Sequence, residues 1–235
     1  MYTSTLPRVS EAHLLALSNI ANGLRIVLRH PKLPESHQVA PVEADLCAKA
    51  ITTLRLRDRF WDSPSDEDFV ICDAEWGQDV FRIQGTTSAM KTLRDPHRKP
   101  LVHMKRELMA PVPTYNVFDA KASAAKLFSI KAQPELNVEF QSPATGEKCR
   151  IGLAGNWPKR QASIWMEQGR KGSRTTIGRV FRPAGSRSSA ATARSSSLSS
   201  SQPDVEYFLA IMGGVDMSLM VLICIALEQA HSEKW

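Results

Sequence analysis

The chain has 235 residues, 43% of them apolar, and a formal net charge of +6. This length suggests one or two domains, and the apolar content excludes a chain too polar to build a core. The charge is uneven, because residues 85–182 hold 18 basic and 7 acidic side chains, whereas residues 58–79 hold eight acidic side chains and one arginine. A charge distribution of this kind favours binding of an anionic partner, although an unevenly charged, solvated surface is the simpler alternative.

Residues 1–50 are predicted to form an N-terminal extension that is partly disordered. Within it, Ser10–Leu28 has a candidate cap at Ser10 and apolar residues at helical spacing, which predicts one helix. Three prolines follow within residues 31–41, and no strand pattern is present. A mitochondrial presequence is the alternative for this segment, but the Ser-rich, acid-free composition of one is lacking, and no secretory signal peptide is indicated.

Residues 51–235 form the predicted main domain. Short runs in which apolar and polar side chains alternate are separated there by turn residues, with the spacing of roughly 8–12 residues that is typical of an all-β fold. We count about twelve candidate strands. The clearest runs are Phe69–Ile71, Phe81–Ile83, Leu101–Glu107, Phe128–Lys131, Leu136–Phe140, Cys149–Leu153, Ala162–Met166 and Val205–Ile211.

Residues 183–203 differ from the rest of this domain. They are mainly Ser, Ala and Arg and lack the large apolar side chains that a core needs, which predicts a disordered insertion between two strands. Phosphorylation of serines beside its arginines would add negative charge near a basic domain and weaken anion binding, although a plain Ser-rich linker is the alternative. These serines are Ser188, Ser189, Ser195, Ser196 and Ser197.

The apolar run at Val215–Leu227 decides the expected fold. Asp216 lies near its start, where a carboxylate suits the helix dipole. A helix that is apolar all round lies either in a core or in a membrane, and this run is shorter than the roughly 20 residues that span a bilayer. We therefore predict no transmembrane span and a mainly β fold, in which a closed barrel of about twelve antiparallel strands surrounds this buried C-terminal helix.

Several segments, in order and over about 180 residues, resemble the LURP-one-related family, a group related to tubby C-terminal-like and phospholipid-scramblase-like proteins. They are Asp68–Asp73 with Val80–Gly85, Lys91–Asp95 with Lys99–His103, Ala162–Trp165 with Ile177–Val180, and Tyr207–Ile211 with Gly214–Asp216. The resemblance implies a twelve-stranded barrel around a hydrophobic helix. Plant members of the LURP-one-related family are linked to defence signalling without known catalysis. The long Ser-rich insertion and Asp95–Arg98, which lacks the turn glycine common in the family, are departures.

No motif of an enzyme class is present, so we expect a protein that is not an enzyme and that uses no cofactor and no metal. The six histidines are scattered along the sequence. Asp73–Asp79 is similar to the start of a calcium loop, but Gln78 and Gln84 stand where such a loop needs Gly and a bidentate Glu. A plain turn is therefore expected there.

Basic residues gather in two turn-like clusters, Asn156–Arg160 and Gly169–Arg174, at opposite ends of a strand predicted at Gln161–Glu167. Tubby-like domains bind phosphoinositide headgroups through surface Lys and Arg, so the resemblance implies a lipid-binding site of such residues. Trp157 and Trp165 would suit either a headgroup layer or the barrel interior. Solvated hairpin turns are the alternative for both clusters. The lipid-binding candidates are Lys91, Lys105, Arg106, Lys159, Arg160, Arg170, Lys171 and Arg174.

Together these patterns predict a tubby-like domain that binds acidic phospholipid headgroups, such as phosphoinositides, through a basic barrel face. The alternative is a protein–protein interaction or signalling scaffold without a lipid ligand. The partner would thus be an anionic membrane lipid or an unidentified protein, because no motif supports nucleic acid. Widely spaced cysteines predict reduced, mostly buried thiols and a cytoplasmic location, with a nuclear or a peripheral membrane location as alternatives. They are Cys47, Cys72, Cys149 and Cys224.

Overall fold

The computed structural model describes residues 33, 38–57, 69–87, 90–121, 125–169, 174–182 and 206–232. Three predicted features lie outside these residues and stay predictions: the helix at Ser10–Leu28, the Ser-rich insertion at 183–203, and Arg170 with Lys171. The acidic residues at 58–68 and Val205 also lie outside the described residues.

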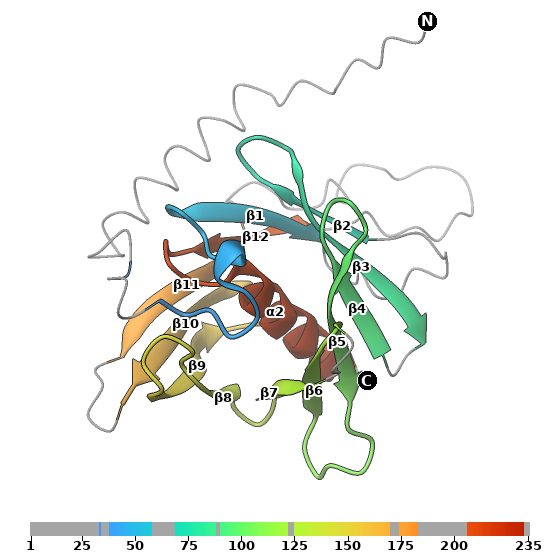
Figure 1. Ribbon diagram of the computed structural model, residues 1–235, viewed down its shortest axis with the longest axis vertical. Helices are drawn as coiled ribbons and strands as arrows, with labels where there is room; N and C mark the ends of the chain where they lie inside the picture. The colour runs from blue at the N-terminus through green and yellow to red at the C-terminus, as the bar shows by residue number, and fades with distance from the viewer. Residues whose placement is uncertain are drawn as a thin grey trace, which may run out of the picture.

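Twelve antiparallel strands close into a single barrel in which each strand pairs with its neighbours in the chain (Figure 1). The barrel closes where β1 pairs with β12, from Thr52 opposite Ile211 to Arg57 opposite Glu206. The predicted mainly β fold with a closed barrel is therefore confirmed. The strands are β1 (Thr52–Arg57), β2 (Phe69–Asp73), β3 (Asp79–Thr87), β4 (Met90–Arg94), β5 (Pro100–Arg106), β6 (Thr114–Asp119), β7 (Lys126–Lys131), β8 (Asn137–Gln141), β9 (Lys148–Asn156), β10 (Gln161–Gln168), β11 (Thr175–Phe181) and β12 (Glu206–Ile211).

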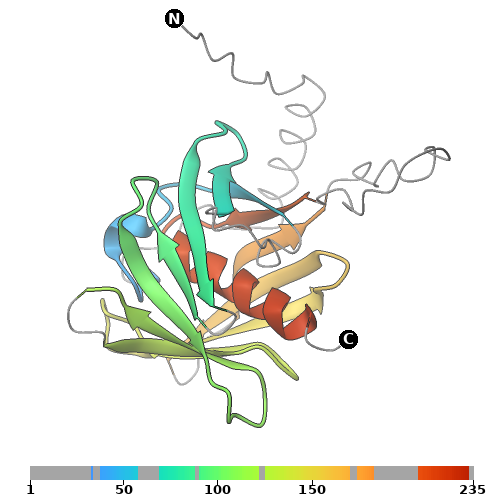
Figure 2. The same cartoon turned by 90° about the vertical axis from the view of Figure 1, so that its right-hand side faces the viewer.

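The single described α-helix, α2 (Met217–Ser232), fills the barrel (Figure 2). Every residue from Ser218 to Ala230 is buried, because inward-facing side chains of all the strands surround the helix. A β-carbon at Gly178 would come within 2.3 Å of the Met220 methyl group, so glycine there lets β11 and α2 approach closely. Within the described part of the chain, no helix combines the length and apolar character needed to cross a membrane.

The start of α2 is fixed by the buried carboxylate of Asp216. Its Oδ1 accepts hydrogen bonds from the backbone N–H groups of Ser218 at 2.9 Å and Leu219 at 3.3 Å, which makes it the N-cap of the helix. Its Oδ2 accepts a bond of 3.1 Å from the N–H of Val42. The carboxylate predicted to suit the helix dipole therefore also ties the helix to a segment far away in the sequence.

That segment, residues 38–50, which we call the cap segment, lies across one end of the barrel and contains the short 3-10 helix η2 (Ala44–Leu46). Its residues Val39, Cys47 and Ala48 are buried, and Val39 and Cys47 form isolated bridges with Val215 and Asp216. Although the sequence assigned residues 38–50 to an N-terminal extension, they contribute to the core of the barrel domain.

The two ends of the barrel differ in what they carry. We call the end where α2 begins the cap end, because residues 38–50 cover it, and the end where α2 finishes the exit end. Since successive strands run in opposite directions, the β5–β6, β7–β8 and β9–β10 turns lie at the exit end, and the β4–β5, β6–β7 and β10–β11 turns lie at the cap end. A hydrogen bond of 2.7 Å from Gln133 Nε2, in the β7–β8 turn, to the carbonyl of Ala230 agrees with this assignment.

Candidate functional site

A groove of about 640 Å³ opens at the exit end, between the β7–β8 and β9–β10 turns. Ligand pockets for small molecules typically have volumes of about 300–1,000 Å³, so a lipid headgroup would fit. We call it the rim groove. It is lined by residues 132–136 and 153–158 together with Arg150, Trp165, Arg174, Leu227 and His231.

Two exposed lysines stand beside the rim groove. Lys131 ends β7 and directly precedes one lining turn, and Lys159 directly follows the other. Among the residues that the structure describes, neither Lys131 nor Lys159 forms an ion pair. The β9–β10 turn is held by a bond of 2.9 Å from the Lys159 N–H to Asn156 Oδ1, so the position of Lys159 is well defined. Neither lysine lines the groove itself, and Lys131 lines a separate hollow of about 420 Å³ on the outer face of β7 and β8. The two lysines would therefore attract an anion to the edges of the groove.

The outer wall of the groove carries two arginines and an indole ring. Arg174 lies over the ring of Trp165, with 4.2 Å between its Cζ and the ring centroid, and Arg150 lies 6.0 Å from the same centroid. Arg174 Nε also pairs with Glu167 at 2.8 Å, and Arg150 Nε donates to Asn137 at 3.1 Å. Both guanidinium groups are thus oriented by neighbours and present further N–H groups for a planar, bidentate contact with an anion.

The floor of the groove includes the buried indole of Trp157. Among the described residues its Nε1–H has no hydrogen-bond partner, which is costly for a buried donor. Trp157 contacts the ring of Tyr207 edge-on, with 6.1 Å between the centroids. A ligand with acceptor oxygens in the groove would have this donor among its neighbours. Of the two tryptophans considered from sequence, Trp157 is thus interior and Trp165 lies on the outer wall.

Arg160 does not lie on the surface, although the sequence makes it a lipid-binding candidate. It is 5% exposed and forms an ion pair with Glu228 of α2, which is equally buried. Its guanidinium also lies 4.6 Å from the ring centroid of Trp157 and 4.7 Å from that of Tyr207. Arg160 therefore fastens α2 to the β9–β10 turn, and a headgroup cannot reach it.

The remaining candidates divide between the two ends of the barrel. Lys91 on β4 is 8% exposed and is therefore interior. Lys105 is exposed and Arg106 half-buried at the exit end of β5, the strand that leads into the β5–β6 turn. Arg174 directly precedes β11 at the cap end, so the rim groove extends from the exit end along the outer wall as far as Arg174. The described residues Lys159 and Arg174 lie at opposite ends of β10, as expected. Arg170, Lys171 and the five candidate serines at 188–197 lie outside the described residues.

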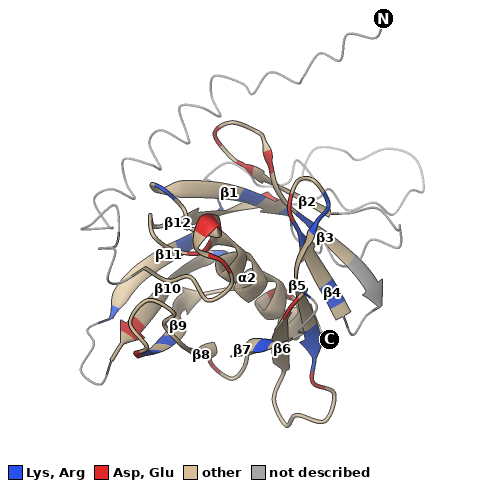
Figure 3. Cartoon of the chain, in the orientation of Figure 1, with Lys and Arg blue, Asp and Glu red and all other residues tan. Residues whose placement is uncertain are grey.

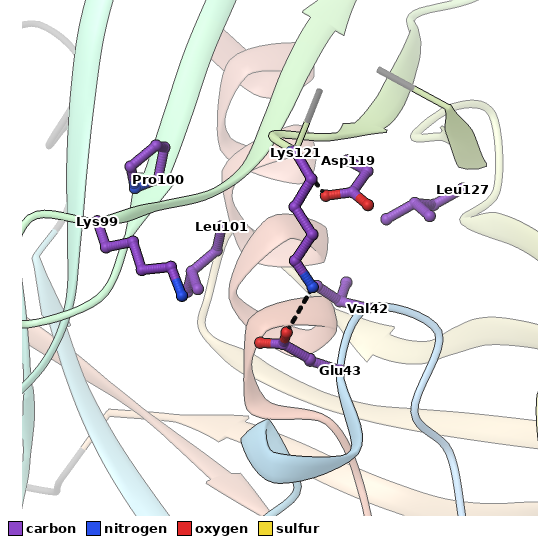
Figure 4. A pocket seen from close by; sticks show the side chains of 8 residues that line it. All are labelled: Val42, Glu43, Lys99, Pro100, Leu101, Asp119, Lys121 and Leu127. Atoms are coloured by element: carbon purple, nitrogen blue, oxygen red, sulfur yellow. Dashed lines mark hydrogen bonds and ion pairs between the residues drawn. The ribbon is translucent and has the colours of Figure 1, made fainter. Parts of the chain in front are cut away.

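A second, much smaller hollow lies at the cap end, where residues 38–50 meet β5, β6 and β7 (Figure 4). Its volume is about 20 Å³, which suffices for one water molecule but for no headgroup. Lys121 Nζ and Glu43 Oε1 form an ion pair of 2.8 Å beside it, and a hydrogen bond and the charge of Glu43 raise the pKa of Lys121. This contact serves to hold the cap segment on the barrel.

The turn after β2 has no ligand geometry either. Asp73 Oδ1 accepts the N–H groups of Glu75 and Trp76, each at 2.8 Å, which makes an Asx turn. The chain therefore makes the turn that the sequence predicts at this place. Over the described ranges, no group of three or more His, Cys, Asp or Glu side chains is arranged to hold a metal ion.

The profile of the LURP-one-related family matches residues 52–228, most of the chain. The chain belongs to the LURP-one-related family. A solved X-ray structure of a protein from Arabidopsis thaliana matches this LURP-one-related chain with a TM-score of 0.53 and 15% identity, over 81% of this chain and 97% of the other. At that identity the match concerns the fold alone. No curated protein matches the chain.

Lys131 and Arg150 of this LURP-one-related domain are not among the residues that the sequence nominates. Both stand in regular alternation on strands, as Lys131 does after Phe128 and Ile130, and such a pattern is common to every exposed strand face. What distinguishes them is the groove, which forms only when the two turns meet at the exit end.

Proposed function

We propose that this domain binds the phosphorylated headgroup of an acidic phospholipid, of the phosphoinositide class, in the rim groove, and that it catalyses no reaction. The observation that supports this best is the pair of exposed lysines, Lys131 and Lys159, without ion-pair partners among the described residues, on either side of a groove of headgroup size. Lys and Arg near the surface of an anionic membrane contribute about 1 kcal/mol each.

The donors in the groove and at its edges suit a ligand with several phosphate groups. A phosphate monoester carries about −1.5 to −2 charges and three acceptor oxygens. Lys131 and Lys159 offer compact, mobile ammonium groups, whereas Arg150 and Arg174 offer planar guanidinium groups whose orientation is set by Asn137 and Glu167. Glu135 also lines the groove, and its negative charge opposes the binding of an anion. A phosphate group should therefore bind better than a ligand that carries a single carboxylate.

The test is co-sedimentation of the purified protein with liposomes that carry phosphatidylinositol phosphates, at low and moderate salt. Replacing Lys131 and Lys159 by Ala together should weaken binding about 10–30-fold, as the loss of two such lysines implies. The matched control replaces Lys99 and Lys126, which are also exposed and form no ion pair in the described structure, but which lie at the cap end. Both double variants change the net charge equally.

The comparison separates a defined site from general attraction. If the headgroup binds in the rim groove, the Lys131/Lys159 variant loses affinity, the Lys99/Lys126 variant does not, and salt weakens binding by the wild type. Equal losses in both variants would mean that the whole charge of the domain, rather than this groove, attracts the membrane. Absence of binding at either salt concentration would leave the protein-interaction scaffold as the function to pursue.

A further inference from the structure

Two large apolar side chains are exposed at the tip of the β5–β6 hairpin. Leu108 is 74% exposed and Met109 is 95% exposed, and the described residues include one other large apolar side chain of this kind, Trp76 at 73%. A single exposed apolar residue is ordinary, but two adjacent ones on a projecting turn are not needed for any packing within the domain. Figure 1 shows this hairpin projecting beyond the neighbouring turns, beside the end of α2.

The tip is held away from the barrel by its own structure. The Glu107 N–H donates to the Thr114 carbonyl at 2.8 Å, and Asn116 Nδ2 donates to Glu107 Oε2 at 3.1 Å, so the base of the hairpin is closed. Pro111 and Pro113 restrict the backbone between the tip and β6. Leu108 and Met109 are therefore exposed to solvent in an ordered turn. Burying these two side chains in a binding partner would cost little conformational entropy, because the backbone is already ordered.

Positive charge lies directly below this apolar tip. Lys105 is exposed on the outer wall at the end of β5 and forms no ion pair in the described structure, and Lys131 projects from the same wall two strands away. Figure 3 shows the basic end of β5 next to the uncharged tip of the hairpin. The extended chain from Lys105 to Leu108 spans at most about 10 Å. This is close to the depth of about 5–10 Å at which apolar side chains enter the headgroup and acyl boundary.

We propose that Leu108 and Met109 insert into the surface of an anionic lipid bilayer while Lys105 and Lys131 remain at the level of its phosphates. This inference rests on the proposed function, and it adds an orientation to it: the exit end faces the membrane, with the rim groove opening toward the headgroups. The charge pattern favours a bilayer over an apolar protein surface, because two lysines below an apolar tip complement phosphates above acyl chains.

The test compares two forms of the same headgroup. Binding of the full chain is measured to vesicles of phosphatidylcholine with phosphatidylinositol bisphosphate, and to the corresponding soluble inositol phosphate. Replacing Leu108 and Met109 by Asp should weaken vesicle binding at least tenfold and leave binding of the soluble inositol phosphate unchanged. The matched control is Trp76→Asp, which introduces an acid at an equally exposed apolar position at the cap end and should leave both unchanged.

A positive readout of insertion comes from an environment-sensitive dye attached to Met109→Cys in a Cys72→Ser background. The emission of the dye should rise and shift to the blue when vesicles are added, whereas the same dye on Trp76→Cys in that background should not respond. Variants at exposed positions should keep the wild-type melting temperature, which a thermal melt checks.

Three outcomes would overturn the inference. Equal vesicle affinity of the wild type and the Leu108/Met109 variant would mean that the headgroup is bound without insertion. A wild-type dimer that the same substitutions convert to a monomer would mean that the tip is a contact between two copies of the chain. Failure of the wild type to bind either vesicles or inositol phosphate would instead reject the proposed function itself, and the insertion with it.

Discussion

The indole ring of Trp165 covers Gly152 on the neighbouring strand β9, so that a β-carbon at residue 152 would lie 2.1 Å from ring atom Cζ2. Any side chain at this position would therefore displace the ring, because the contact is far shorter than van der Waals distance. The glycine thus fixes the indole between Arg150 and Arg174 in the wall of the rim groove.

Gly152→Ala is expected to shift the indole of Trp165 and weaken vesicle binding several-fold, with a loss of stability of about 1 kcal/mol, which is typical of a point mutation. The emission spectrum of Gly152→Ala should differ from the wild type, and the difference should vanish when both proteins also carry Trp165→Phe. Unchanged emission and unchanged binding in Gly152→Ala would show that the ring has another way to pack.

The buried pair of Arg160 and Glu228 should matter more for stability than for binding. Removing one partner of a buried ion pair costs about 3–5 kcal/mol, because the other charge stays buried without its counterion. Arg160→Ala should therefore lower the free energy of unfolding by this amount in urea denaturation. The double variant Arg160→Leu with Glu228→Leu should lose clearly less. Additive losses in the double variant would argue against direct coupling of the two charges.

Asp216→Ala removes the N-cap of α2 and the acceptor for the cap segment at once. An N-cap contributes about 0.5–2 kcal/mol, and an unsatisfied buried N–H costs about 1–3 kcal/mol. We expect a loss of about 2–4 kcal/mol in the free energy of unfolding, together with faster amide hydrogen exchange in residues 38–50. Exchange that stays slow in that segment would show that other contacts suffice to hold it.

The titration of Asp216 gives stability a distinct pH dependence. Burial raises the pKa of its carboxyl, while hydrogen bonds from Ser218 and Val42 oppose the rise. Because the folded state then binds the proton more tightly than the unfolded state, the contribution is fully present below the unfolded pKa and is lost as pH rises through the folded pKa. The stability of the wild type relative to Asp216→Asn should therefore fall as pH increases above about 4, the pKa of an unfolded aspartate. A difference that rises with pH would contradict this.

The four free cysteines should differ sharply in reactivity. Burial raises the pKa of Cys47 to about 11, and it also raises the pKa of Cys149 and of Cys224. At pH 8 these thiols remain protonated and shielded, whereas Cys72 is half-buried. In the native protein one thiol should react with a maleimide at this pH, none in Cys72→Ser, and all four after unfolding. A second thiol that reacts at a similar rate would indicate local opening of the barrel.

The fold was largely predictable because local patterns encode it. Alternation with period two identified most strands, and the apolar run at Val215–Leu227 identified the central helix, although the helix continues to Ser232. The last turn of the helix is not predicted from sequence, because the charged Glu228 ends the apolar run. In the barrel, Glu228 is buried against Arg160. Strand β6 was not recognised, since Phe118 faces outward and prolines crowd its start.

The candidate site was predictable only in part, because it depends on which strand ends meet. Lys159, nominated as a lipid-binding residue, is exposed. Its neighbour Arg160, nominated for the same role, is interior, because the left-handed turn at φ 53° directs it toward α2. Lys131 could have been grouped with Lys159 by counting strands, since every second turn of an antiparallel meander lies at the same end. No property of the sequence near Lys131 alone reveals that a groove begins beside it.

The order of elements along the chain has a consequence for biosynthesis. The helix that fills the barrel follows all twelve strands, and β12, which closes the barrel on β1, is the last of them. During synthesis, the strands therefore leave the ribosome before α2. Until α2 follows, the apolar faces of the strands lack the helix against which they pack in the folded domain. We expect nascent chains of this protein to depend on chaperones until residues 217–232 emerge, and premature termination anywhere before α2 to yield an insoluble product.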